Sequence, residues 1–234
     1  MKVGITLPQF ALEPGPMLAA AVEAEQGGLD GVFLFDHLWP MGSPDRPVLA
    51  ALPSLGAVAA ATTSIRVGSL VMRVGLVPDR VMVEQMGDLN AVSAGRLVAG
   101  LGTGDRLSAA ENHAYGIAYP PADERRESLH RCASELAAGG VEVWIGVGAA
   151  VAPATRLVAA RIGAPVNVWN TGVAAVAGET ELEVTWGGPV PGGRTAIETH
   201  LSAMAEAGAS WVVCAWPDSI TDVAAAARSV LGRP

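Results

Sequence analysis

Lysine is almost absent from this sequence of 234 residues, in which Lys2 is the only one. One lysine leaves little room for Schiff-base chemistry and none for the lysine of a phosphate-binding P-loop. An anionic ligand would have to be bound by arginine side chains or by backbone N–H groups. The net charge of −8 argues in addition against a nucleic-acid partner, because proteins that bind nucleic acid present a basic face.

Cysteine and long apolar runs are scarce as well. Cys132 and Cys214 are far apart, which favours free buried thiols over a disulfide or a metal-binding pair. The four histidines form no zinc pattern, and neither CxxC nor HExxH occurs, so we expect no metal. No apolar run approaches the length of about 18 residues that spans a bilayer, and the first residues do not resemble a signal peptide. We therefore expect a cytoplasmic protein that has no membrane partner.

Short apolar runs alternate with Ala-rich segments along the whole chain. Half of the residues are hydrophobic and 16% are charged, which allows a large core. The runs predict strands at residues 2–8, 31–36, 65–72, 96–102, 141–147, 164–170, 181–186 and 210–216. Eight such units with helices between them favour a parallel (β/α)₈ barrel, the TIM barrel, as a single domain over residues 1–234. An open, doubly wound sheet is the alternative.

A charged pair closes the second apolar run. Asp36 and His37 follow Val32–Phe35 directly, either as a solvated cap of the strand or at the mouth of a site. A barrel favours the second interpretation, because its sites lie at the carboxyl ends of the strands. Trp39, Trp169, Trp186 and Trp216 also follow predicted strands, where aromatic rings suit a flat heteroaromatic ligand; packing under loops is the alternative.

Two glycine-rich turns follow the fourth and fifth predicted strands. The first, AGLGTGDR at 99–106, predicts either a tight turn or a wall for a planar ring, with Asp105 directed into the pocket. It is not a dinucleotide fingerprint, because Asp105 replaces the third glycine and no helix is expected directly after it. The second, WIGVGAAVAPATRL at 144–157, joins a strand to a helix and predicts phosphate binding by free N–H groups at the helix start, with Arg156 further along the helix and a plain loop as the alternative.

The segment EQMGDLNAVSAGRLVAGLGTGD, at 84–105, resembles the signature of the bacterial luciferase-like monooxygenases. Members show a Q-x-x-x-L-D-x-L-S-x-G-R-x-x-x-G-x-G-x-G pattern. The matching residues here are Gln85, Leu89, Ser93, Gly95, Arg96, Gly100, Gly102 and Gly104, and Asn90 stands in place of the usual acid. The stretches 4–10, 62–72, 119–129 and 143–170 resemble other units of the family.

This resemblance implies a barrel that binds FMN or the deazaflavin coenzyme F420, and the Asp36–His37 pair is similar to the F420 branch. It places His37 beside the deazaflavin and Asp105 as a proton donor, so these are the predicted catalytic residues. The turn at Val71–Met72 resembles a bulge behind the ring, often with a non-proline cis peptide, and Gly146–Ala149 resemble the loop for the cofactor's phosphate. The predicted cofactor-binding residues are Asp36, Val71, Met72, Gly102, Thr103, Gly104, Gly146, Val147, Gly148, Ala149 and Trp169.

From the resemblance we expect a coenzyme F420-dependent oxidoreductase that transfers a hydride between the deazaflavin and a small organic substrate. An FMN-dependent monooxygenase and a non-catalytic flavin-binding paralogue are the alternatives, and a homodimer is implied by the resemblance alone. Gln9 stands where the family's sugar-phosphate dehydrogenases carry a glutamate. The loop at 186–193 is short, which implies a pocket that is open or completed by a partner subunit.

Overall fold

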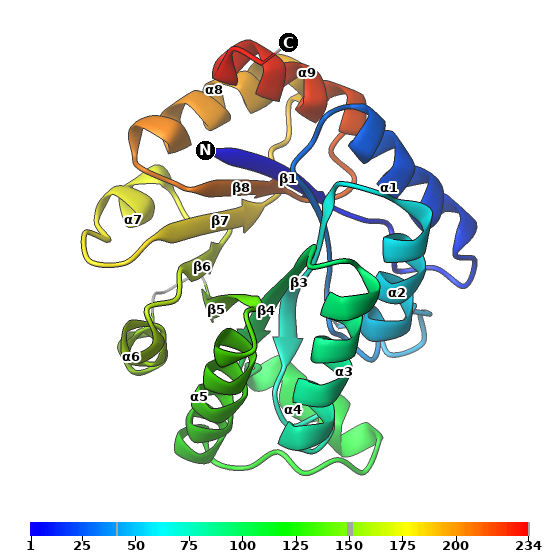
Figure 1. Cartoon of the computed structure of the whole chain (residues 1–234), viewed down its shortest axis with the longest axis vertical. Coiled ribbons are helices and arrows are strands. Elements are labelled where there is room, and N and C mark those ends of the chain that lie inside the picture. The colour runs from blue at the N-terminus through cyan, green and yellow to red at the C-terminus, as the bar shows by residue number, and fades with distance from the viewer. Residues whose placement is uncertain (41, 149–151, 234) are drawn as a thin grey trace.

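The computed structural model describes residues 1–40, 42–148 and 152–233. Within these residues, parallel strands β1 to β8 close into a barrel in chain order, and helices surround it (Figure 1). The strands are β1 (Lys2–Thr6), β2 (Gly31–Leu34), β3 (Arg66–Arg73), β4 (Leu97–Gly102), β5 (Glu142–Gly148), β6 (Val166–Trp169), β7 (Val184–Gly188) and β8 (Trp211–Cys214). The helices are α1 (Gly15–Gln26), α2 (Ala51–Ala61), α3 (Asp79–Val92), α4 (Arg106–Ala114), α5 (Ala122–Ala138), α6 (Pro153–Ile162), α7 (Val173–Ala177), α8 (Gly193–Glu206) and α9 (Ile220–Leu231). The predicted (β/α)₈ barrel is confirmed, and the open sheet is wrong.

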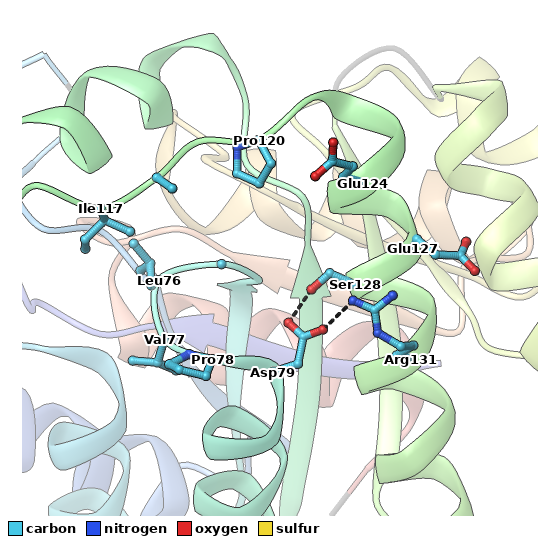
Figure 2. A pocket seen from close by; sticks show the side chains of 12 residues that line it. Leu76, Val77, Pro78, Asp79, Ile117, Pro120, Glu124, Glu127, Ser128 and Arg131 are labelled. Carbon is cyan, nitrogen blue, oxygen red and sulfur yellow. Dashed lines mark hydrogen bonds and ion pairs between the residues drawn. The ribbon is translucent and has the colours of Figure 1, made fainter.

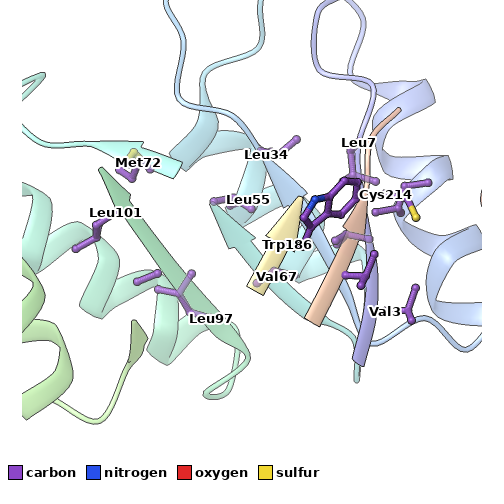
Figure 3. Close-up of a cluster of buried hydrophobic side chains, with 14 of the residues drawn as sticks. Val3, Leu7, Leu34, Leu55, Val67, Met72, Leu97, Leu101, Trp186 and Cys214 are labelled. Atoms are coloured by element: carbon purple, nitrogen blue, oxygen red, sulfur yellow. The ribbon is translucent and has the colours of Figure 1, made fainter. Parts of the chain in front are cut away.

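Both faces of the strands are buried, and they face two separate cores. A smaller cluster of mostly bulky side chains contains Phe33, Trp144 and Trp211, whose ring centroids lie 5.3 to 5.7 Å apart. Their sequence neighbours, such as Val32 and Val212, belong to the larger cluster that includes helix residues (Figure 3). Because successive strand residues point to opposite faces, the smaller cluster fills the barrel and the larger one joins it to the helices.

The predicted bulge in β3 is present. The register between β3 and β4 shifts between Ser69 and Met72, and the Leu70–Val71 peptide bond is cis. Glycines make room for this bulge. A Cβ at Gly100 would lie 2.2 Å from the Ser69 carbonyl oxygen, and one at Gly102 would lie 2.5 Å from the Val71 side chain. Gly100 and Gly102 thus lie within β4, and the close approach of the neighbouring strand explains both.

Arg96, part of the segment that resembles the family signature, holds the amino end of the barrel together. Its guanidinium group donates hydrogen bonds to the carbonyls of Ala59, Thr62 and Ile65, in the turn between α2 and β3. It also donates to the Ser93 carbonyl beside its own turn. Since Arg96 precedes β4, this motif stabilises the end of the barrel opposite to the strand ends where a site is expected.

A helix that the sequence analysis did not predict follows β4 at once. Asp105 is the N-cap of α4: its carboxylate accepts hydrogen bonds from the backbone N–H groups of Leu107 and Ser108, at 2.9 and 3.0 Å. The Ser108 hydroxyl accepts one from the Asp105 N–H in return, which completes a capping box. The expectation that no helix follows this turn is therefore wrong.

The structure bears on the predicted state of the cysteines and on the predicted lack of membrane-spanning segments. Both cysteines are buried and free, as predicted. Among the described residues, every helix is too short or too polar to reach across a bilayer.

Glu25 on α1 makes part of the fold's stability dependent on pH. Burial of its carboxylate opposes ionisation, but hydrogen bonds from the N–H groups of Ser64, Ile65 and Thr63 prevail and lower its pKa from 4.5 to about 2. A lowered folded-state pKa adds stability above about pH 4.5, and this contribution is lost as pH falls towards 2.

We expect Glu25→Gln to destabilise the protein by about 1–3 kcal/mol at neutral pH, and by progressively less between about pH 4.5 and pH 2. Urea denaturation of the variant and the wild type across this range measures the difference. Glu84→Gln, at an exposed position on α3, is the control and should show no such trend. If the difference in the free energy of unfolding between Glu25→Gln and the wild type stayed constant with pH, the lowered pKa of Glu25 would be contradicted.

Candidate functional site

A cavity of about 480 Å³ opens at the carboxyl ends of β2 to β6. Its volume lies in the range of sites for small molecules and cofactors. The residues that line it are Phe35, Asp36, His37, Leu70, Val71, Arg73, Gly102, Thr103, Gly104, Asp105, Ser108, Gly146, Val147, Gly148, Ala152, Thr155, Asn167 and Trp169. The structure thus brings together both predicted catalytic residues and most of the predicted cofactor-binding residues.

One predicted cofactor-binding residue, Met72, lies in the core and not at the cavity wall. Met72 is 3% exposed and packs in the larger core near Leu101, and it is not among the described lining residues (Figure 3). Its neighbour Val71 takes the place in the wall, because the bulge in β3 decides which side chain faces inward. Ala149 lies outside the described residues.

Aromatic rings form one side of the cavity. Trp169 meets Phe35 edge to face, with the ring centroids 5.3 Å apart, and Phe35 lies 6.4 Å from His37. Trp186 was predicted to follow a strand end, but it lies within β7, is buried, and donates its indole N–H to the Thr171 carbonyl. Of the four tryptophans predicted for an aromatic rim, only Trp169 is among the described lining residues.

A buried ionic network lies behind His37. The imidazole Nδ1 is 2.8 Å from Oε1 of Glu111, a residue of α4 that is 1% exposed. The other carboxylate oxygen, Oε2, accepts hydrogen bonds from the Leu38 N–H and from the Arg73 guanidinium, both at 3.0 Å. The side chain of His37 remains 18% exposed at the cavity. The Nδ1 side of the imidazole is therefore held by Glu111, while part of the ring is exposed to the cavity.

Asp36 belongs to the same cluster. Its carboxylate accepts a hydrogen bond from the backbone N–H of Arg73 at 2.9 Å, which ties the end of β2 to the end of β3. Burial raises the pKa of Asp36 above its usual value, although the hydrogen bond and the charge of Arg73 act in the opposite direction. Two guanidinium nitrogens of Arg73, Nε and Nη1, are buried and have no hydrogen-bond partner in the described part of the chain.

Asp105 faces the cavity as the cap of α4. Partial burial opposes ionisation of its carboxylate, but hydrogen bonds from Ser108 and Leu107 prevail and lower its pKa. A carboxyl group with a lowered pKa is ionised at neutral pH and holds no proton to donate. Its position in the cavity agrees with the sequence analysis, whereas its hydrogen bonds favour a role in fixing α4.

Gln9, which the sequence analysis singled out as a departure near the substrate, is a structural residue. It is fully buried, and its amide donates to the carbonyls of Phe35 and Leu49 and accepts from the Phe35 N–H. These contacts join the segment after β1 to the segment after β2. Gln9 is not among the described residues of the cavity wall.

The amino end of α6 forms another part of the wall, through Ala152 and Thr155. This helix has no side-chain cap and no acid in its first turn. However, Pro153 has no N–H, and the N–H groups of Thr155 and Arg156 donate to the Ala152 carbonyl. The candidate donor to an anion in the first turn is therefore the Ala154 N–H. Arg156 points elsewhere, because its guanidinium group pairs with Glu179 and Glu181. Phosphate binding by this helix would use backbone groups.

A second cavity, of about 580 Å³, lies between the loop after β3 and the start of α5 (Figure 2). Glu124 and Glu127 are among its polar residues, and a third acid, Asp79, accepts hydrogen bonds from Ser128 and Arg131. The rest of the wall includes Leu76, Ile117 and other apolar side chains. This cavity contains none of the residues that the sequence analysis selected.

Sequence reasoning missed Glu111, and it placed Arg73 at a strand end without giving it a role. Glu111 is 74 positions from His37 in the chain, and nothing in a local pattern links the two. A prediction of α4 would have offered the signal, because it would have placed an acid on a helix that starts at the mouth. In the part of the chain that the structure describes, no group of three histidine, cysteine or acidic side chains is suited to hold a metal.

Comparison with known proteins gives a consistent set of matches. The model of one protein family, described as luciferase-like monooxygenase, matches residues 1–135. An F420-dependent glucose-6-phosphate dehydrogenase of Beutenbergia cavernae is 36% identical over 118 residues, which are 50% of this chain and 34% of the relative. A protein of the same name from Kineococcus radiotolerans is 32% identical over 126 residues, 53% of this chain and 36% of the relative. The match thus spans about a third of the length of these relatives.

Solved structures resemble the whole barrel at low identity. An F420-dependent secondary alcohol dehydrogenase in complex with an F420–acetone adduct superposes with a TM-score of 0.81 at 12% identity, over 98% of both chains. The coenzyme F420-dependent tetrahydromethanopterin reductase of Methanopyrus kandleri gives a TM-score of 0.73 at 13% identity, over 99% of both chains. At these identities the likeness shows the fold alone.

Proposed function

The chain belongs to the luciferase-like monooxygenase family, and from that premise we propose that it is a coenzyme F420-dependent oxidoreductase that acts on a small organic substrate. The observation that carries the proposal is His37, which is held by a buried carboxylate at the wall of a 480 Å³ cavity. The names of the relatives support F420 over FMN. Cytoplasmic location, a single domain and a homodimer stay predictions.

The residues of the cavity fit a flat tricyclic ligand with a phosphate-bearing tail. Val71 projects from the bulge, and a Cβ at Gly102 or Gly146 would lie 2.5 or 3.0 Å from its side chain, so the glycines keep this part of the wall close to Val71. We assign the ring to this wall and to Trp169, and the phosphate to the amino end of α6, where the Ala154 N–H is the candidate donor. When bound, the deazaflavin supplies hydride transfer.

The protein's own part in the reaction is proton transfer and orientation. An imidazole gives and takes protons near neutral pH, so His37 can accept the proton of a substrate hydroxyl, or return it to a carbonyl in the reverse direction. The nitrogen available for this is Nε2, because Nδ1 is occupied by Glu111. We assign Asp105 to the fixing of α4, and through it of Glu111, instead of to proton donation.

Titration of the purified protein with F420 and with FMN tests the proposal. We expect saturable calorimetric binding of F420 in the micromolar range or tighter, and binding of FMN that is weaker by about tenfold or more. Thr103→Trp, which adds a large ring in the cavity wall, should abolish binding of both. Tighter binding of FMN would favour the monooxygenase, and F420 binding without turnover of any alcohol or sugar phosphate would favour the non-catalytic paralogue. Binding of neither cofactor would contradict all three.

A further inference from the structure

Glu111 has a defined pattern of donors around its two oxygens. Oε2 receives two N–H donors, from the Leu38 backbone and from the Arg73 guanidinium. Neither donor can change its role, because a backbone N–H and a guanidinium only donate. Oε1 lies 2.8 Å from Nδ1 of His37. Of the three contacts, only this one could have its hydrogen on either atom, on Nδ1 or on Oε1. Glu111 and Arg73 are buried, at 1% and 3% exposed, so the carboxylate is shielded from water.

A carboxylate oxygen only accepts, and Arg73 supplies the positive charge that keeps Glu111 ionised in this buried place. Nδ1 of His37 must then carry its hydrogen and donate it to Oε1. In the neutral ring the second nitrogen, Nε2, is left as an acceptor, and the ring is exposed on the side of the cavity. The arrangement resembles the general pattern in which a carboxylate selects the tautomer of a histidine.

We propose that Glu111 is a positioning residue that holds His37 as the Nδ1–H tautomer, so that Nε2 faces the cavity as the proton acceptor. The use of Nε2 in catalysis rests on the proposed function, whereas the tautomer itself does not. Arg73 and the Leu38 N–H take part by fixing the orientation of the carboxylate. No local pattern in the sequence connects these residues.

The variant Glu111→Gln tests the proposal, because glutamine keeps the shape of the side chain and replaces one carboxylate oxygen with an NH₂ donor. The two donors on the Oε2 side require the amide oxygen there, which places the amide NH₂ towards Nδ1. His37 must then accept at Nδ1 and carry its hydrogen on Nε2. We expect the tautomer to invert, so that the nitrogen at the cavity can no longer take a proton.

Long-range ¹⁵N–¹H correlation spectra of the protein, with ¹⁵N-labelled histidine and without cofactor, measure the tautomer directly. The wild type should show His37 protonated on Nδ1, and Glu111→Gln should show it protonated on Nε2. Glu84→Gln is the matched control, because it makes the same chemical change at an exposed position on α3; it should keep the wild-type tautomer of His37. A wild-type His37 protonated on Nε2, or an unchanged tautomer in Glu111→Gln, would overturn the proposal. The first of these outcomes is measured on the wild type and does not require that the variant folds.

Kinetics and binding separate this inference from the proposed function. With F420 bound, Glu111→Gln should lower kcat by about 10²–10⁴-fold, while KM and the affinity for F420 change only a few-fold. If the spectra show the expected tautomers but F420 does not bind, the positioning role stands and the proposed function fails. If F420 binds and turns over but the tautomer is the opposite one, the positioning role fails alone.

Discussion

Replacement of His37 by asparagine is expected to lower turnover by about 10²–10⁴-fold, with the affinity for F420 changed only a few-fold. The reason is positional: the imidazole lies in the cavity wall next to Phe35 and is fixed from behind by Glu111, so it is placed to exchange a proton and contributes only part of the binding surface. Asparagine fills part of the volume but cannot exchange a proton near neutral pH.

Turnover should be measured with the alcohol or sugar phosphate that the wild type oxidises fastest in a panel, and binding should be measured separately by calorimetry. His113→Asn is the control, because His113 is exposed and lies on the same helix as Glu111. It should leave both quantities unchanged. Retention of more than about a tenth of the wild-type turnover by the His37 variant would count against proton transfer at this residue.

Alanine at Gly100 or Gly102 is expected to destabilise the protein by about 1–3 kcal/mol or more, because each new methyl group would overlap the β3 bulge. The two variants differ in what they meet. At Gly100 the obstacle is the backbone oxygen of Ser69, at 2.2 Å, which cannot move aside without shifting the strand. At Gly102 the obstacle is a terminal methyl of Val71, at 2.5 Å.

A second substitution should therefore distinguish them. Val71→Ala removes the obstructing methyl and leaves the Cβ of residue 71 at 3.7 Å from the new methyl at 102, an ordinary contact. We expect it to restore most of the stability lost in Gly102→Ala and little of that lost in Gly100→Ala, where the Val71 methyl lies at 3.3 Å and the Ser69 oxygen remains at 2.2 Å. A double-mutant cycle from urea denaturation would show the difference.

Gly87→Ala on α3 is the reference for alanine at an unobstructed glycine and should stabilise slightly, by about 0.5–1 kcal/mol. Equal rescue of Gly100→Ala and Gly102→Ala by Val71→Ala would refute this account of the bulge.

The barrel was predictable because apolar runs such as Val32–Phe35 recur at regular spacing and both faces of a parallel strand are buried. The positions of Asp36, His37 and the glycine turns at the carboxyl ends followed from the same pattern. Resemblance to the family added the bulge, which the register of β3 and β4 confirms.

Three features could not be obtained in this way, each for a physical reason. The bulge alters the alternation of side chains in β3, so Val71 and not Met72 faces the cavity. The start of α4 depends on a capping box between Asp105 and Ser108, in a segment that otherwise has few apolar residues. Glu111 acts through a contact over 74 positions, which only the closed barrel creates.

The hydrogen bonds of Arg96 have a consequence for how this protein can diversify. They fasten the turn before β3 to the turn before β4 at the rim remote from the cavity. The hydrogen bonds of Arg96, which stabilise the barrel, thus lie at the end of the barrel opposite to the cavity, where a substrate would be selected. Loops around the opening can accept new sequences under selection for other substrates, while the distant pole preserves the scaffold on which they are displayed.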